Sequence, residues 1–235
     1  MYENVMGIVL KSVNYRENDR MLTLFTREKG MLSALARGCR KQDGSLKAVS
    51  DLFCCSDLQL YEKGGRYFVT QGVLRESFYE LRRDIKALMT ATVLAEATAQ
   101  VATAEPNPRL FALLVNALYS AMKGQDAMSV FVFFQFKLLD ILGLRPELGQ
   151  CVSCGAAAAP KLNLALGGAV CEACPGESVN PVWLDKIRQV YRLPSKKMNQ
   201  FTVDGDRGLF LLAKRWMENV LERAPRSIAL LETVL

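Results

Sequence analysis

The most informative absence in this chain of 235 residues is histidine, which does not occur once. Without an imidazole there can be no Ser-His-Asp or Cys-His nucleophile, no HExxH metalloprotease site, and no zinc finger built from two cysteines and two histidines. The sequence also contains no GxxxxGK[ST] loop and no GxGxxG element, so nothing in it supports ATP hydrolysis or dinucleotide chemistry. These absences favour a binding protein over an enzyme.

Long apolar runs are absent as well. The longest, from Val130 to Phe134, is followed by Gln135 and is far shorter than the roughly 20 apolar residues that span a bilayer. The first residues show no basic segment followed by an apolar stretch, so we expect neither secretion nor a membrane segment. Half of the residues are hydrophobic, and the chain is long enough for more than one core. We therefore expect a folded, cytoplasmic protein.

Four of the seven cysteines form the pattern C-x2-C-x16-C-x2-C. Two close thiol pairs separated by such a loop can place four sulfurs at the corners of a tetrahedron, which is the geometry of a closed structural zinc site. Redox-active thiols are an alternative, although neither pair opens a helix at the end of a βαβ strand. Disulfides would need an oxidising compartment. The expected ligands of one structural zinc ion are Cys151, Cys154, Cys171 and Cys174.

The three remaining cysteines are isolated from this pattern and lie in apolar or strand-like surroundings. A lone cysteine in such surroundings behaves as a small hydrophobic side chain. We expect Cys39, Cys54 and Cys55 to be buried.

The first 77 residues have the pattern of a small β barrel. Short apolar runs alternate with turn residues, and in the run from Met21 to Thr26 successive residues fall on opposite faces, as in a strand. Residues 44–53, between the third and fourth runs, are long enough for one short helix. Five strands with such a connection match the OB-fold, which commonly binds single-stranded nucleic acid or oligosaccharide; an SH3-like barrel is the alternative. The expected strands are residues 5–15, 21–26, 31–37, 55–61 and 66–74.

After residue 77 the pattern becomes helical. Ser77 and Glu80 have the spacing of a capping box, which predicts a long helix that runs to about Ala104. The segment 127–142 is apolar on nearly all sides and should be the central helix of a bundle. Further helices are expected from Asn107-Pro108 to Gly124, from Asn180-Pro181, over residues 207–223, and from Ser227 to the end.

Together these patterns predict an α+β multidomain protein. An N-terminal five-stranded OB-fold barrel should occupy residues 1–77, and an α-helical domain residues 78–235. The four-cysteine zinc module, residues 150–176, is then an insertion within the helical domain.

The net charge of +6 is concentrated near the N-terminus, where the first 47 residues hold nine basic against five acidic residues. A groove for a single nucleic-acid strand needs such charges near aromatic faces on which bases stack. The alternative is a solvated basic surface with the aromatics in the barrel core. The candidate stacking residues are Tyr15, Phe25, Tyr61, Tyr67 and Phe68. The candidate nucleic-acid-binding residues are Arg16, Arg20, Arg27, Lys29, Arg37, Arg40, Lys41 and Lys47.

An ordered set of short segments resembles the RecO family of bacterial recombination mediators. No single motif is decisive, but the order is specific and the resemblance covers essentially the whole chain. Cys39 is a departure, because the family more often has alanine there; a small side chain is kept. The segments are Glu17-Asn18-Asp19-Arg20, residues 24–30, Ala36-Arg37-Gly38, and residues 144–148 leading into Cys151-Val152-Ser153-Cys154-Gly155.

The resemblance implies a cytoplasmic, nucleoid-associated and non-enzymatic DNA-repair protein. It would bind single- and double-stranded DNA and anneal complementary strands. It would act with RecR on strands coated by single-strand-binding protein and so help to load RecA. Two rivals remain: an OB-fold RNA-binding protein with a structural zinc, and a thiol-based redox enzyme.

Overall fold

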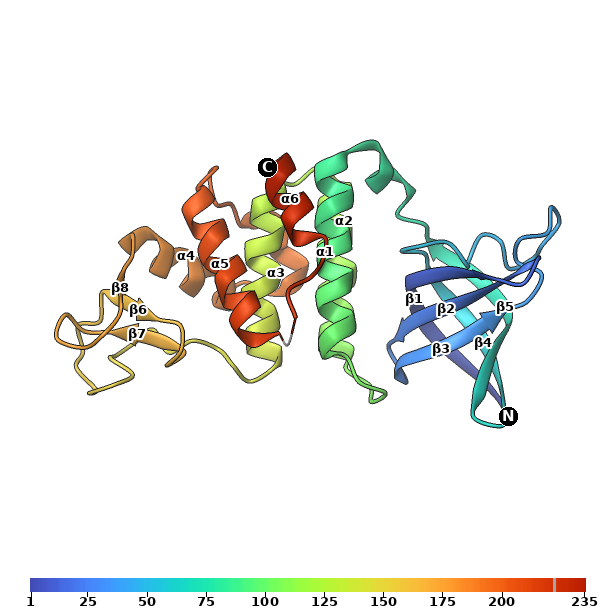
Figure 1. Ribbon diagram of the computed structural model, residues 1–235, viewed down its shortest axis with the longest axis horizontal. Helices are drawn as coiled ribbons and strands as arrows, with labels where there is room; N and C mark the ends of the chain where they lie inside the picture. Colours follow the sequence, from blue (N-terminus) through green and yellow to red (C-terminus); the bar gives the residue numbers. More distant parts are fainter. Residues whose placement is uncertain (222) are drawn as a thin grey trace. The chain divides into compact units, whose positions relative to one another are not determined.

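The computed structural model describes residues 1–221 and 223–235, and its N-terminal part is a closed barrel of five strands (Figure 1). Around the barrel the strands follow the order β1-β2-β3-β5-β4, and β4 pairs back with β1. Strands β3 and β5 run parallel, whereas the other four pairs are antiparallel. This is the OB-like barrel that the sequence predicts. The strands are β1 (Tyr2–Tyr15), β2 (Asp19–Thr26), β3 (Gly30–Ala36), β4 (Cys55–Lys63) and β5 (Arg66–Glu76).

The alternation along the strands fills the barrel. Leu22 and Leu24 of β2 are fully buried in its core with Leu58 and Leu60 of β4. Because side chains alternate between the two faces of a strand, the neighbouring Met21 lies on the outer surface, where it is 37% exposed. The apolar period therefore decides which face of each strand is buried.

The connection between β3 and β4 differs from the prediction of a short helix over residues 44–53. It forms consecutive turns, closed by backbone hydrogen bonds from Gly44 to Lys41, from Lys47 to Gly44 and from Ser50 to Lys47. Leu46 and Val49 are three residues apart, like the turns, and both side chains are part of the barrel core. Burial of these two side chains sets the path of the segment, so turns replace a regular helix.

The predicted capping box at Ser77 does not form, and the long helix begins later. The Ser77 hydroxyl accepts a hydrogen bond from the Tyr79 amide (3.3 Å), while Glu80 pairs with Arg83 (2.8 Å). Phe78 adopts a left-handed conformation with φ of +49°, and its side chain is fully buried. Burial of this ring is incompatible with a regular helix through Phe78. The elements that follow are the 3-10 helix η1 (Tyr79–Arg83) and α1 (Ile85–Val101).

The chain divides into two compact units. The first consists of Met1–Ile85 and Ala95–Ala112, so it includes the barrel and a helical segment. Within this unit the Met31 amide donates a hydrogen bond to the Thr103 carbonyl (2.7 Å). The rings of Phe25 and Phe111 lie 5.7 Å apart. These contacts attach the helical segment to strands β2 and β3.

The second unit consists of Lys86–Leu94 and Leu113–Leu235. The helix predicted to be central is buried on nearly all sides, and Phe136 packs edge-on against Trp216 (5.7 Å between ring centroids). The Asn180 side chain caps the following helix as predicted, by accepting from the Val182 amide (3.0 Å). Among the described residues, no helix has both the length and the apolar character needed to cross a bilayer. The helices that follow α1 in the chain are α2 (Pro108–Met122), whose residues up to Ala112 belong to the first unit, α3 (Ala127–Ile141), α4 (Pro181–Arg192), η2 (Ser195–Gln200), α5 (Arg207–Val220) and α6 (Ile228–Val234).

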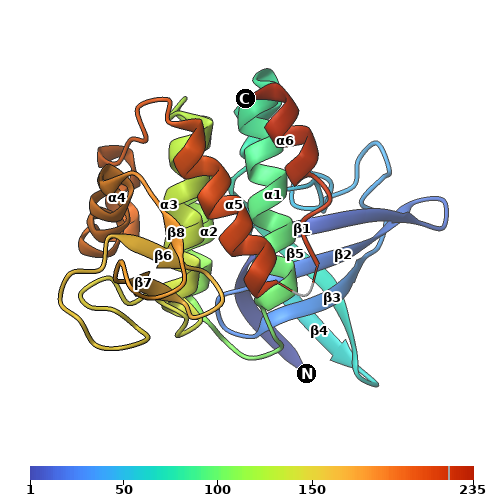
Figure 2. The ribbon, with the colours of Figure 1, turned by 60° about the vertical axis from the view of Figure 1, so that its left-hand side comes forward.

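A small sheet with the order β7-β6-β8 lies between α3 and α4 in the chain. Figure 2 shows it beside α4 and α5 of the same unit. Arg215 of α5 forms a two-point ion pair with Glu177 of β8, in which Nη1 lies 2.8 Å from Oε2. This pair ties the small sheet to the helices. The strands are β6 (Lys161–Asn163), β7 (Gly168–Val170) and β8 (Glu177–Ser178).

Candidate nucleic-acid interface and metal centre

A cleft of about 480 Å³ lies at one end of the barrel, where the turn between β1 and β2 meets the segment that leaves β3. Three of its lining residues are basic, and all three side chains are exposed. The cleft thus brings together two of the basic segments that the sequence singled out. The residues that define this basic cleft are Arg16, Glu17, Asn18, Asp19, Arg37, Gly38 and Lys41.

Hydrogen bonds hold the two walls of the basic cleft together. The Asp19 carboxylate accepts from the Gly38 amide (2.8 Å). Arg40 crosses between the walls twice: its amide donates to the Asn18 carbonyl (3.0 Å) and its guanidinium to the Glu17 carbonyl (2.8 Å). Arg40 therefore positions the cleft, and its remaining N–H groups are available for a ligand because a guanidinium carries five.

Two arginines of the basic cleft rest on aromatic rings. The Arg37 guanidinium carbon lies 4.8 Å from the centre of the Phe68 ring, and that of Arg16 lies 5.3 Å from the centre of the Tyr15 ring. A guanidinium over a ring is held in place while its edge can still donate to phosphate oxygens. These interactions orient two charges without neutralising them.

Arg40 and the other four predicted basic residues lie outside the lining of the basic cleft. Arg20 is paired with Asp51, Nη1 to Oδ1 2.5 Å. Lys29 is paired with Glu3, and its hydrogen bond to that carboxylate raises the pKa of Lys29. Lys29 follows the far end of β2, whose eight residues extend roughly 25 Å from the cleft. The remaining two, Arg27 in the turn after β2 and Lys47 in the connection after β3, are exposed.

The predicted stacking residues occupy different environments. Phe25 is fully buried against Phe111, so the prediction that it stacks bases is wrong: its ring joins the barrel to the helical segment of the same unit. Tyr67 packs against the barrel core. Tyr61 and Phe68 lie together on the outer surface, with ring centroids 6.5 Å apart. Tyr15 is 40% exposed beside Arg16.

Sequence reasoning missed one aromatic residue of this surface. The ring of Tyr2 lies 4.9 Å from that of Tyr61, because the first strand pairs with the fourth and places these two residues opposite each other. The start of β1 also carries Glu3 and Asn4, which hide the apolar alternation. Only the closure of the barrel reveals that the two rings meet.

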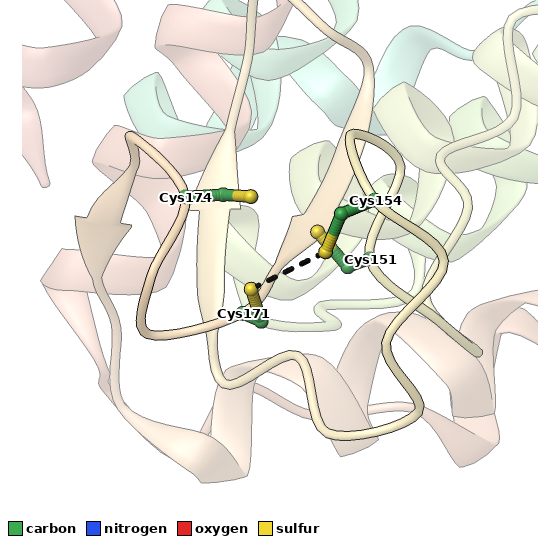
Figure 3. Close-up of side chains that lie close together, drawn as sticks. All are labelled: Cys151, Cys154, Cys171 and Cys174. Atoms are coloured by element: carbon green, nitrogen blue, oxygen red, sulfur yellow. Dashed lines mark hydrogen bonds between the residues drawn. The ribbon is translucent and has the colours of Figure 1, made fainter.

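The four cysteines of the repeated pattern converge in the second unit. Their sulfur atoms all lie within 4.8 Å of one another, and Figure 3 shows the side chains pointing toward a common centre. The Sγ atoms of Cys154 and Cys171 are 3.6 Å apart. In a tetrahedral site with metal–sulfur bonds of about 2.3 Å, sulfurs are separated by about 3.8 Å. The donor set therefore fits a four-thiolate metal site.

Backbone hydrogen bonds form the loops that carry these thiols. Gly155, with φ of +77°, donates its amide to the Cys151 carbonyl (2.9 Å), so a tight turn follows the first cysteine pair. The Lys161 ammonium bridges the carbonyls of Glu172 and Cys174, at 2.8 Å each, and so closes the second pair against β6. The local fold thus holds the four ligands together.

The two thiols on the buried side of this cluster ionise most readily. Hydrogen bonding with the backbone of Cys171 is the main cause that lowers the pKa of Cys151, to about 6. A hydrogen bond with the Cys154 side chain lowers the pKa of Cys171. The pKa values of Cys154 and Cys174 are raised, so these two thiols keep their protons longer. Thiolates are the form that binds metal, so Cys151 and Cys171 are the ligands that deprotonate first.

The cysteines of the barrel have the opposite character. Cys39, Cys54 and Cys55 are buried, as predicted. Burial raises the pKa of Cys54 and Cys55 to about 11. A thiol that stays protonated is a poor nucleophile and a poor ligand, so Cys54 and Cys55 serve packing. Cys39 is part of the barrel core.

Comparison with known proteins agrees with this architecture. Residues 1–78 match the family described as "Recombination protein O N terminal", and residues 82–228 match "Recombination protein O C terminal". The two matches together span the barrel and most of the helical part, in the order that the structure shows.

Individual relatives extend the comparison. The chain is 35% identical over 174 residues to the DNA repair protein RecO of Alkaliphilus metalliredigens. The aligned region covers 72% of this chain and 71% of the relative. It is 31% identical over 236 aligned residues to the DNA repair protein RecO of Desulfitobacterium hafniense strain DCB-2. This alignment covers 94% of this chain and 86% of the relative. The chain therefore belongs to the RecO family of DNA repair proteins.

Proposed function

We propose that this protein is a non-enzymatic recombination mediator that binds single- and double-stranded DNA through the basic cleft. In this proposal it anneals complementary strands without ATP. Together with RecR it helps RecA to load onto strands coated by single-strand-binding protein, in the cytoplasm at the nucleoid. The observation that carries the DNA-binding step is the convergence of Arg16, Arg37 and Lys41 on one cleft of the barrel.

The chemistry of this cleft suits a phosphate backbone. Its three basic side chains are exposed, and within the described part of the chain none of them forms an ion pair. Cations that contact phosphates release condensed counterions, and such interactions carry no base information. We therefore expect binding with little sequence preference. The other predicted residues, Arg20, Arg27, Lys29, Arg40 and Lys47, are proposed as a wider basic surface around this centre.

Annealing follows from the same property. Two complementary strands repel each other, and a protein that neutralises phosphates on both lowers this repulsion while raising their local concentration. Pairing itself then provides the free energy. No nucleotide-binding loop is needed, and the sequence contains none.

We propose that the four-cysteine cluster holds one zinc ion through Cys151, Cys154, Cys171 and Cys174. The mutual approach of their sulfurs supports this assignment. Four protein ligands leave no open coordination position, so the ion would stabilise the fold and would not take part in chemistry.

We further propose a functional division at residue 77, with a DNA-binding barrel in residues 1–77, a helical domain in residues 78–235, and the zinc module, residues 150–176, within it. The end of β5 at Glu76 and the position of β6 to β8 between α3 and α4 support this division. In this arrangement the helical domain is the platform for protein partners.

A strand-annealing assay tests the proposed function. Annealing of complementary fluorescent strands should be accelerated equally with and without ATP. The cleft-reversal variant, which carries Arg16→Glu, Arg37→Glu and Lys41→Glu, should anneal no faster than strands alone. Addition of RecR should then increase RecA assembly on strands coated with single-strand-binding protein. An absolute ATP requirement, or full annealing by the cleft-reversal variant, would contradict the mechanism.

A further inference from the structure

Three aromatic side chains form a row across the outer surface of the barrel. Tyr2 of β1 is paired with Tyr61 of β4, and Tyr61 with Phe68 of β5. The ring centroids are 4.9 Å apart in the first pair and 6.5 Å in the second, and both pairs of ring planes are tilted by 38°. We call Tyr2, Tyr61 and Phe68 the aromatic row.

The aromatic row is not part of the barrel core. The residues beside it along the strands, Leu60 and Val69, point inward and fill that core. Tyr2 is 63% exposed, whereas Tyr61 and Phe68 are half-buried. Exposed aromatic rings in register on adjacent strands are a cost in water unless another molecule covers them. Their arrangement therefore points to a ligand with flat apolar faces.

The aromatic row is continuous with the basic cleft. Arg37, which lines that cleft, lies over the ring of Phe68 at 4.8 Å. A ligand that leaves the cleft past Arg37 thus meets Phe68 first, and then Tyr61 and Tyr2. The combination of fixed positive charge at one end and aromatic faces beyond it matches the alternation of phosphates and bases in a nucleic-acid strand.

We propose that the aromatic row is a stacking platform for the unpaired bases of single-stranded DNA whose backbone occupies the basic cleft. This inference rests on the proposed DNA binding and adds to it the origin of a preference for single strands over duplex. The interactions of the cleft with phosphates are common to both forms of DNA, whereas the interactions of the row with bases are available only to the unpaired form.

The arrangement of the rings suits unpaired bases. Tyr2 and Tyr61, with centroids 4.9 Å apart, are in contact and present one joint face, and Phe68, 6.5 Å from Tyr61, presents the next. A base can lie on such a face only if it has left the stack of its own strand. Duplex bases also have their flat faces covered by their neighbours, so the row offers them little.

The adjoining charge favours a nucleic acid over a protein as the occupant. Aromatic residues and arginine are also common in protein interfaces, but a cluster of three cations without carboxylate partners among the described residues favours a polyanion. Here Arg37 stands directly over one ring of the row, and Arg16 and Lys41 share its cleft. A polyanion with aromatic bases satisfies both features with a single molecule.

The test compares variants that each remove one ring of the aromatic row. Tyr61→Leu and Phe68→Leu each delete a stacking face at a half-buried position. Tyr2→Ser deletes the exposed ring and touches no core residue, so it reports even if a leucine variant folds poorly. Tyr79→Leu is the matched control: Tyr79 is 61% exposed and has Arg82 over its ring (5.3 Å), but it follows the far end of β5.

Equilibrium binding is measured by fluorescence anisotropy with three probes of equal length: a single strand, a strand of the same charge that lacks bases over its central part, and a duplex. Removal of each ring should weaken single-strand binding by about fivefold to 150-fold, because stacking on one base contributes about 1–3 kcal/mol. In Tyr2→Ser and Tyr61→Leu, binding of the base-free strand and of the duplex should change less than about twofold. Phe68→Leu also frees the Arg37 guanidinium from its ring, so all three probes weaken there and the single strand should weaken most. The salt dependence should be unchanged, since every variant keeps its charges.

The outcomes separate this inference from the proposed function. Equal weakening for all three probes, or wild-type single-strand binding by Tyr2→Ser and both leucine variants, would overturn the stacking platform while DNA binding stands. If Tyr79→Leu weakens single-strand binding as much as the variants of the aromatic row do, the stacking platform is overturned as well. Absence of DNA binding in the wild-type protein would overturn both proposals.

Discussion

The Asp19 carboxylate accepts a hydrogen bond from the Gly38 amide at 2.8 Å, and this bond joins the two segments that form the basic cleft. Asp19 begins β2, whereas Gly38 follows the end of β3 with φ of +66°. A negatively charged residue inside a basic cleft thus has a structural function. It fixes the positions of the arginines on either side.

Replacement of Asp19 separates this structural function from its charge. Asp19→Ala should lower the free energy of unfolding by about 1–2 kcal/mol, because it removes a charge-assisted hydrogen bond to the backbone. Asp19→Asn removes the same charge but keeps an oxygen acceptor, so its free energy of unfolding should be closer to that of the wild type. Chemical denaturation of the three proteins provides the comparison. Equal stability of the two variants would show that the bond to Gly38 does not stabilise the fold.

Gly30 and Gly64 allow steric crowding to be separated from backbone strain. Their φ values are similar, +62° and +58°. A Cβ on Gly30 would lie 2.3 Å from the carbonyl oxygens of Thr103 and Glu105, whereas a Cβ on Gly64 would meet nothing within 4 Å. Gly64→Ala should therefore cost about 1 kcal/mol, the usual strain of a left-handed residue. Gly30→Ala should cost at least about 2 kcal/mol more.

Thermal unfolding of both alanine variants tests this difference. If the two variants have the same unfolding temperature, the barrel and the segment around Thr103 are not held at the short distances described above. A larger destabilisation in Gly30→Ala would confirm that this segment is an integral part of the barrel unit.

The thiol cluster predicts one tightly bound zinc ion per chain. Cys171→Ser should abolish stoichiometric zinc and lower the free energy of unfolding by about 3 kcal/mol or more, because zinc binding to such a site is coupled to folding. Cys39→Ala, a buried cysteine outside the cluster, should keep the metal. Metal analysis by mass spectrometry and denaturation measure the two effects. A metal-free wild-type protein of full stability would rule out the zinc site.

The sequence predicted the barrel well because its signals are local. Alternating apolar residues such as Leu22 and Leu24 mark the strands, and polar turns mark their ends. The prediction failed at Ser77. Ser77 and Glu80 have the sequence spacing of a capping box, but Phe78 between them is buried and has a left-handed backbone, so the helix does not begin there. Burial in the tertiary structure overrode a local signal there.

The candidate sites differ in how much of each could be predicted from residues that are close together in the sequence. The four cysteines could be predicted because each pair is close in sequence and their spacing is typical of metal ligands. The ion pairs that engage Arg20 and Lys29 could not, since their partners Asp51 and Glu3 lie 31 and 26 residues away. The approach of Tyr2 to Tyr61 also depends on the closure of the barrel. Long-range pairing decides which charges and rings form a surface.

The salt dependence of single-strand binding tests the central claim, that the basic cleft holds the DNA backbone. The cleft-reversal variant is compared with the wild type and with a matched reversal of Arg192, Lys196 and Lys197, three basic residues of the second unit. The matched reversal changes the net charge by the same amount and tests a basic segment of the second unit.

We expect the slope of log affinity against log salt to fall in the cleft-reversal variant by about 0.7 for each phosphate that is no longer neutralised, and thus by about two for three phosphates. The matched reversal should retain the wild-type slope. A wild-type slope in the cleft-reversal variant, or a reduced slope only in the matched reversal, would contradict the account and place the DNA on the helical part of the chain.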